Sequence, residues 1–187
     1  MSGTVRWPLA EAEGIAGELL ALLASSCERI EIAGSIRRKK STCGDVELLC
    51  IPKPSDNLFH TDALDEGVTA LLVASPPILA MRPSIKGITA YGPKNKLLVH
   101  VKSGIGVDIF STDAENWGMA LLIRTGSREF NIRVMARLKQ LGMSGHAYPK
   151  PGQGAITSSS GADIFCPDED IVFRNLGWAY LPPEKRQ

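Results

Sequence analysis

The chain has 187 residues, of which 44% are hydrophobic and 22% charged, and this composition excludes a disordered or fibrous protein. A net charge of +1 argues against a uniformly basic nucleic-acid binder. The scattered cysteines argue against a disulfide framework and a zinc site, so we expect them to be reduced. Because no apolar run reaches the roughly 18–20 residues of a membrane helix and no signal peptide is evident, we expect a cytoplasmic protein without a membrane partner.

The first half of the chain predicts strands and helices in alternation. Apolar spacing indicates an amphipathic helix over residues 8–26, a strand over 29–33 and a more buried strand over 46–51. A second helix is expected over residues 62–74, with Thr61 or Asp62 as its cap.

Between residues 85 and 110 the pattern indicates β structure. Leu97, Val99 and Val101 alternate with other residues, as they do in a strand. In the last strand of this stretch Ile105, Val107 and Ile109 share one face, so Asp108 points to the other.

From residue 113 onward the pattern becomes mainly helical. Asp113 can cap a helix over 114–123, and a second apolar stripe ends at Gly142. Residues 149–161 are rich in Pro, Gly and Ser and predict a loop. Acidic residues at 168–170 suit the start of a last helix, which Gly177 can end. The change in character predicts two parts, residues 1–112 and 113–187.

Two carboxylates on one strand are the strongest chemical signal. Asp45 and Glu47 lie two residues apart, so their side chains share a face, with backbones about 7 Å apart. Such a pair can bridge two Mg²⁺ ions that clamp the attacking and leaving oxygens of a phosphoryl displacement. Asp108, which is turned away from its apolar neighbours, is the best candidate for a third ligand.

The residues that precede this strand suit a phosphate. Gly34 and Ser35 offer backbone N–H groups and a hydroxyl, and Arg37 or Arg38 offers a fork of donors. Each feature alone is common on a solvated surface. Together, carboxylates for metal ions and donors for phosphate predict a nucleotidyl-transfer site.

Four segments resemble DNA polymerase family X, the polymerase-beta-like nucleotidyltransferases, and specifically its minimal viral form with only palm and thumb. They are the Gly-Ser-x-Arg-Arg and Gly-Asp-x-Glu motifs within 34–49, Val107-Asp108-Ile109, Thr125-Gly126-Ser127 with Phe130-Asn131, and residues 178–186. The resemblance implies an α+β fold: a palm of mixed sheet with helices on one face over 1–112, and a small α/β thumb over 113–187 that binds nucleotide and primer-template.

The resemblance also implies roles for the site residues. Asp45 and Glu47 would ligate both metal ions, and Asp108 would ligate the catalytic one and help to deprotonate the primer 3′-hydroxyl. Ser35 and Arg38 would hold the β- and γ-phosphates beside Gly34, with the backbone of Gly44 assisting. In the thumb, Thr125 and Gly126 would border the sugar, and Asn131 would face the minor-groove edge of the incoming base.

The implied activity is DNA-directed transfer of a nucleotide from a dNTP to a DNA 3′-hydroxyl, in gap filling or end repair. Two Mg²⁺ ions would be the cofactors, with Mn²⁺ as a substitute, and DNA would be bound as a primer-template or gapped duplex. The expected DNA-binding residues are basic: Arg37, Lys39, Lys40, Arg128, Arg133 and Arg137. We expect a monomer without lyase activity, either cytoplasmic or encoded by a virus or phage and acting in the host cytoplasm.

Three departures from the family pattern keep alternatives open. Glu47 replaces the usual Asp, Ile123-Arg124 replaces an aromatic pair, and Gly106 replaces a basic residue, which predicts a weaker contact with the primer phosphate. One alternative is a template-independent nucleotidyltransferase that acts on RNA, protein or a small molecule. The other is a catalytically weakened module that binds DNA ends. For Trp178 and Tyr180 we expect packing within the thumb rather than stacking on bases.

Overall fold

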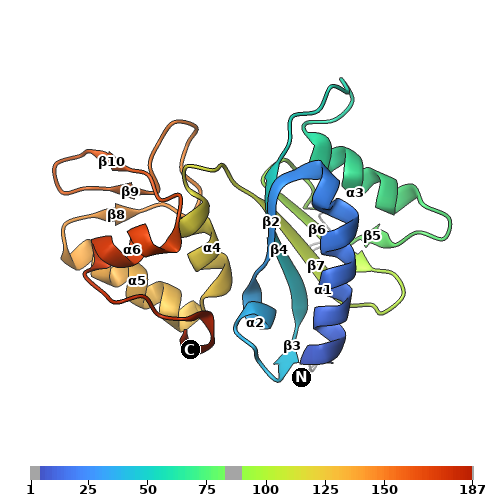
Figure 1. Cartoon of the computed structure of the whole chain (residues 1–187), viewed down its shortest axis with the longest axis horizontal. Helices are drawn as coiled ribbons and strands as arrows, with labels where there is room; N and C mark the ends of the chain where they lie inside the picture. Colours follow the sequence, from blue (N-terminus) through green and yellow to red (C-terminus); the bar gives the residue numbers. More distant parts are fainter. Residues whose placement is uncertain (1–4, 83–89, 187) are drawn as a thin grey trace. The chain divides into compact units, whose positions relative to one another are not determined.

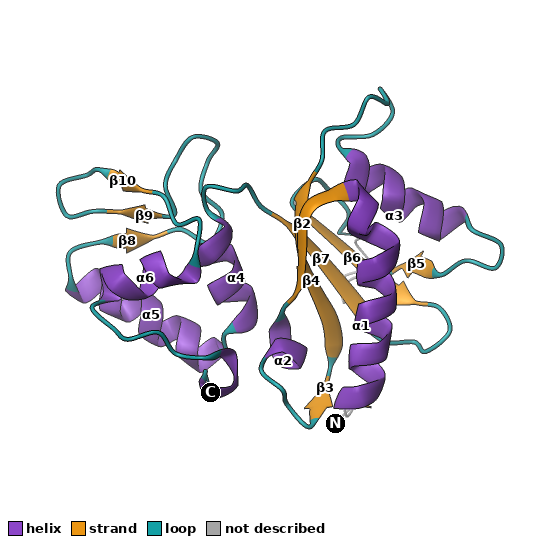
Figure 2. Cartoon of the chain, in the orientation of Figure 1, coloured by secondary structure: helices purple, strands orange, loops and turns teal. Residues whose placement is uncertain are grey.

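The computed structural model describes residues 5–82 and 90–186, and the chain divides into two compact units, Met1–Ser111 and Thr112–Gln187 (Figure 1). The boundary lies one residue before the position expected from the sequence. The start of the β pattern expected near residue 85 lies outside the described residues. The combination of sheets and helices confirms the expected α+β class (Figure 2).

A five-stranded mixed sheet organises the first unit, in the order β2-β4-β7-β6-β5. Only the central pair, β4 and β7, is parallel, and the other neighbours are antiparallel. The strands are β2 (Cys27–Ile32), β4 (Asp45–Pro52), β5 (Leu79–Met81), β6 (Asn95–His100) and β7 (Gly106–Ser111). A short pair, β1 (Trp7–Pro8) with β3 (Thr42–Cys43), joins residues near the N-terminus to the segment that leads into β4.

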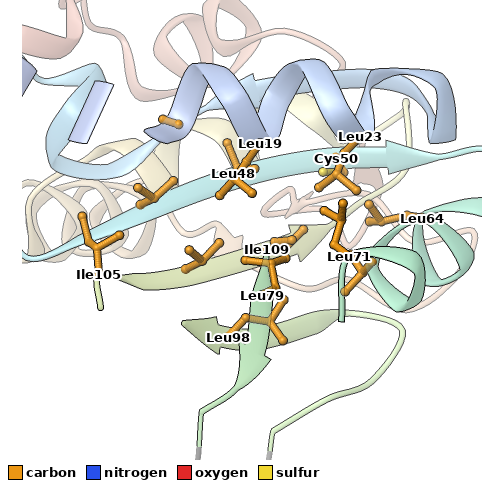
Figure 3. Close-up of a cluster of buried hydrophobic side chains, with 14 of the residues drawn as sticks. Leu19, Leu23, Leu48, Cys50, Leu64, Leu71, Leu79, Leu98, Ile105 and Ile109 are labelled. Atoms are coloured by element: carbon orange, nitrogen blue, oxygen red, sulfur yellow. The ribbon is translucent and has the colours of Figure 1, made fainter. Parts of the chain in front are cut away.

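Helices α1 (Leu9–Leu23) and α3 (Ala63–Val73) cover one face of this sheet (Figure 1). Figure 3 shows their leucines meeting alternate residues of β4 and β7, such as Leu48 and Ile109. Asp62 caps α3 by accepting a hydrogen bond from the Asp65 N–H at 2.7 Å, as expected. A 3₁₀ turn, η1 (Ala24–Ser26), follows α1, and the four-residue helix α2 (Gly34–Arg37) follows β2.

Strand β6 alternates as predicted, but its fully buried side includes two polar residues. Lys96, Leu98 and His100 are buried, whereas Leu97 and Val99 are half-buried on the opposite face. The Lys96 ammonium lies 3.2 Å from the Gly92 carbonyl and 3.5 Å from the Asp65 carboxylate, and these contacts compensate for its burial.

Three helices and a small sheet form the second unit. They are α4 (Trp117–Thr125), α5 (Arg128–Gln140), α6 (Glu169–Leu176), the 3₁₀ turn η2 (Pro183–Lys185), and strands β8 (Ser144–Gly145), β9 (Ile156–Thr157) and β10 (Asp163–Ile164). Strand β9 lies between the other two, so the expected loop over 149–161 contains the middle strand. Buried residues such as Phe130, Val134 and Phe173 form a core of their own.

Two helix boundaries test the expected caps. The helix expected from residue 114 begins at Trp117, because the Asp113 carboxylate accepts the Asn116 N–H at 2.8 Å and forms a turn before the helix. The last helix ends as predicted at Gly177, whose φ of 67° lies in the left-handed region. None of the helices in the described ranges has the length and apolar character that a bilayer span requires.

Candidate active site

The register of the two central strands brings the predicted carboxylates together. On the parallel pair β4 and β7, Glu47 lies opposite Asp108 and Asp45 lies opposite Gly106. Side chains of paired residues point to the same face of a sheet, and Asp45 and Glu47 are two residues apart. All three carboxylates therefore belong to one face, here called the acid face. Helices α1 and α3 pack on the opposite face, with Val46, Leu48 and Val107.

Gly34 lies against the Glu47 side chain at the edge of the acid face. Its φ of 63° is in the left-handed region. A Cβ atom at this position would lie 3.0 Å from Glu47 Cδ and closer still to Oε2. The longer side chain of Glu47 thus brings its carboxylate onto the start of α2, where the phosphate-binding residues were predicted. Glycine is required here by both the backbone conformation and the space.

Ser35 lies on α2 directly after Gly34, and Arg38 lies at the C-terminal end of that helix. The Ser35 hydroxyl is buried and has no hydrogen-bond partner among the described residues. A buried polar atom without a partner costs free energy, and a bound oxygen atom would satisfy it. Arg38 is half-buried, and its charge acts on the Asp45 carboxylate.

Two further arginines, which the sequence did not identify, act on the same carboxylates: Arg82 on Asp108 and Asp45, and Arg6 through its charge on Asp45. Arg82 follows β5, and its guanidinium forms an ion pair with Asp108. Arg6 donates hydrogen bonds to the Thr42 hydroxyl at 2.9 Å and the Thr42 carbonyl at 2.7 Å, next to the short strand pair. No local pattern distinguishes either residue, because each reaches the site through strand pairings between segments far apart in the chain.

Burial raises the pKa of the Asp45 carboxyl above its ordinary value, and the Arg82, Arg6 and Arg38 guanidiniums offset part of this effect. Several positive charges therefore converge on one half-buried carboxylate. This arrangement favours binding of a polyanion beside the carboxylates.

The donor set of the acid face suits a hard divalent cation, because Mg²⁺ and Mn²⁺ prefer carboxylate oxygens. As the side chains stand, no group of three Asp, Glu, His or Cys residues in the described part of the chain is arranged to hold an ion. Asp108 is instead paired with Arg82. The residue types and their shared face therefore fit the cation. In this structure, however, the three carboxylates do not point to one position where an ion could bind.

The thumb residues predicted from the resemblance form a tight turn between α4 and α5. Thr125 is fully buried, and the Gly126 N–H donates to the Leu122 carbonyl at 2.8 Å. Asn131 Nδ2 donates to the Ile123 carbonyl at 2.7 Å, which uses one of its two amide hydrogens. Its Oδ1 is buried with no hydrogen-bond partner in the described chain. Contact of Asn131 with a base stays a prediction.

The basic residues predicted to bind DNA differ in accessibility. Arg128 and Arg133 are exposed on α5. Arg137 is half-buried on the same helix, and its Nε donates to the Leu176 carbonyl at 3.1 Å. Contact of Arg137 with DNA stays a prediction. In the first unit, Lys39 forms an ion pair of 2.5 Å with Glu13. Arg37 and Lys40 are half-buried, and Gly44 is half-buried just before β4.

Comparison with known proteins places both units in context. Residues 120–187 match the family described as DNA polymerase beta thumb. The chain is also similar to DNA polymerase lambda of Rattus norvegicus, with 30% identity over 171 residues that cover 82% of this chain. The chain spans about 28% of the length of that relative.

Proposed function

The chain belongs to DNA polymerase family X, the polymerase-beta-like nucleotidyltransferases, and from this we propose that it transfers nucleotides from dNTPs to a DNA 3′-hydroxyl under the direction of a template. The observation that carries the proposal is the pairing of Glu47 with Asp108 in the β4–β7 register, with Asp45 on the same face. The Gly34–Ser35 segment lies against the Glu47 side chain, which supports phosphate binding next to these carboxylates.

The residues around Gly34 would hold the triphosphate. The Ser35 hydroxyl, buried and without a partner in the described chain, would donate to a phosphate oxygen. Arg38 and Arg6 would neutralise negative charge on the triphosphate, because both already act on Asp45. Positioning and charge neutralisation are the main contributions that a protein makes to phosphoryl transfer.

Asp108 would accept the proton from the primer 3′-hydroxyl. The oxygen would then attack the α-phosphate of the dNTP, forming a new P–O bond, and the bond to pyrophosphate would break. Asp45, Glu47 and Asp108 would hold two Mg²⁺ ions, or Mn²⁺ ions in their place. When bound, such ions stabilise charge on the attacking and leaving oxygens.

Each unit would contribute its own contacts to DNA and nucleotide. In the second unit, Arg128 and Arg133 are exposed on α5 and can contact phosphates. The turn at Thr125 and Gly126 would border the sugar. We place the protein in gap filling or end repair, and we expect a monomer in the cytoplasm.

Primer extension by the full chain tests the proposal. A labelled primer is offered in a one-nucleotide gap, at a recessed end and as a single strand, with Mg²⁺ or Mn²⁺ and each dNTP in turn. We expect incorporation of the dNTP complementary to the template. Incorporation irrespective of the template would instead support a template-independent transferase. No incorporation on any DNA with Mn²⁺ present, by a protein whose circular dichroism shows it folded, would overturn the proposal.

Replacing Gly34 with alanine is expected to lower the extension rate about a hundredfold, because the new Cβ must displace the Glu47 carboxylate and a misplacement of about 1 Å can cost that much. The residue would also carry the strain of a positive φ. Gly14→Ala is the matched control, because a Cβ at Gly14 in α1 meets nothing within 4 Å. Single-turnover extension measures both variants, and equal rates would contradict the assigned place of Gly34.

A further inference from the structure

The space beside Gly106 on the acid face is filled by the side chain of Arg82, the residue that follows β5. Gly106 lies opposite Asp45 in the β4–β7 register and two residues before Asp108. A Cβ atom at Gly106 would lie 3.3 Å from Arg82 Cζ, closer still to Arg82 Nη1, and 3.7 Å from Asp45 Cβ. The guanidinium of Arg82 therefore lies over the glycine, next to Asp45, and reaches Asp108.

The sequence predicted a weaker contact with the primer phosphate, because Gly106 stands where the family has a basic residue, and this stays a prediction. In the structure, Arg82 brings a guanidinium to the same part of the acid face. The absence of a side chain at Gly106 is what admits it. The backbone of Gly106 does not have a positive φ, so the need for glycine here is one of space.

We propose that Arg82 is a positioning residue that holds the Asp108 carboxylate in the metal-free protein and competes with a divalent cation for it. The Asp108 side chain is 16% exposed and that of Arg82 33%, so the pair is partly shielded from water. A cation that binds an oxygen of Asp108 must either displace the guanidinium or share the carboxylate with it. The positive charge beside Asp45 opposes the same cation. This inference rests on the proposed function, because the cation is the one proposed there.

Binding of Mn²⁺ to the full chain without DNA or dNTP tests the inference, with free Mn²⁺ measured by electron paramagnetic resonance. We expect Arg82→Gln to bind Mn²⁺ about tenfold more tightly than the wild type, because the cation no longer has to displace a guanidinium from Asp108 and no longer meets its positive charge beside Asp45. Arg82→Lys keeps the charge and should bind close to the wild-type level. Equal or weaker binding by Arg82→Gln, or no binding by either protein, would overturn the inference.

Two further variants separate this role from general effects of charge or folding. Arg29→Gln removes the same charge from an exposed pair with Glu31 and should leave Mn²⁺ binding unchanged. Gly106→Ala should tighten binding in the same direction as Arg82→Gln, because its Cβ meets the end of a flexible side chain and would push the guanidinium aside. Tighter Mn²⁺ binding by Arg29→Gln, or wild-type Mn²⁺ binding by Gly106→Ala, would contradict the assignment.

A double-mutant cycle then tests the pairing itself. In an Asp108→Asn background, Arg82→Gln should tighten Mn²⁺ binding much less, by only the part that comes from its charge beside Asp45, whereas a purely structural role would give the same change in both backgrounds. None of these measurements requires polymerase activity. Failure of wild-type primer extension with an intact Arg82 effect would overturn the proposed function alone.

Discussion

Asp108→Asn should reduce templated primer extension about a thousandfold while the protein stays folded. Asparagine has nearly the same shape, but its amide cannot accept the proton of the 3′-hydroxyl and is a poor ligand for a hard cation. Transition-state stabilisation by a metal ion is worth several kcal/mol, and each 1.36 kcal/mol corresponds to about a tenfold change in rate. The effect should be larger than that of any other single substitution on the acid face.

Single-turnover extension of a gapped substrate with saturating dNTP measures this effect, and circular dichroism checks the fold. Asp56→Asn serves as the matched control, because Asp56 is exposed in the loop that follows β4. The substitution is the same chemical change, made away from the acid face. An Asp108→Asn protein whose extension rate stays within tenfold of the wild-type rate would show that Asp108 has no role in the proposed reaction. So would an equal loss in the Asp56→Asn protein.

Arg186→Ala is expected to lower the free energy of unfolding of the unit Thr112–Gln187 by about 3–5 kcal/mol, since it leaves Glu169 buried without its charge partner. Arg186 is 0% exposed and binds the Glu169 carboxylate through two nitrogens, at 2.5 Å and 3.0 Å. The guanidinium also lies 5.2 Å from the Phe173 ring centroid and 5.5 Å from that of Tyr180. One side chain thus ties the end of the chain to α6.

Calorimetric unfolding of the full chain measures this loss, because the two units have separate cores. Lys185→Ala is the control: Lys185 is the exposed neighbour of Arg186, and its removal should have little effect. Arg186→Lys should recover only part of the stability, because an ammonium cannot reproduce the two-pronged contact. A loss in Arg186→Ala no greater than in Lys185→Ala would show that the buried pair does not stabilise this unit.

The C-terminal segment also illustrates how much the sequence alone predicts. The aromatic residues there were expected to pack within the thumb, and Tyr180 does lie edge-on to Phe173, with ring centroids 5.2 Å apart. The buried ion pair beneath them was not expected, because Glu169 and Arg186 look like ordinary surface residues in sequence. Burial of a charge depends on what the rest of the fold places around it.

Local patterns by themselves determined the two strands that carry the acids and the face on which each acid lies. Alternation along β4 and β7 puts Asp45 and Glu47 on one face and turns Asp108 away from Ile105, Val107 and Ile109, because the side-chain period of a strand is a local property. The glycine at position 34 likewise reflects a local backbone conformation.

Only the tertiary structure decided which charges meet on the acid face. The register that sets Glu47 beside Asp108 joins strands about sixty residues apart. Arg82 reaches Asp108 from the end of β5, a strand that is separated from β7 by β6. Strand pairing and the space left by a glycine are non-local, since they depend on which segments share a core rather than on neighbouring residues. The sequence therefore predicted the acids, and the fold selected the arginine that neutralises one of them.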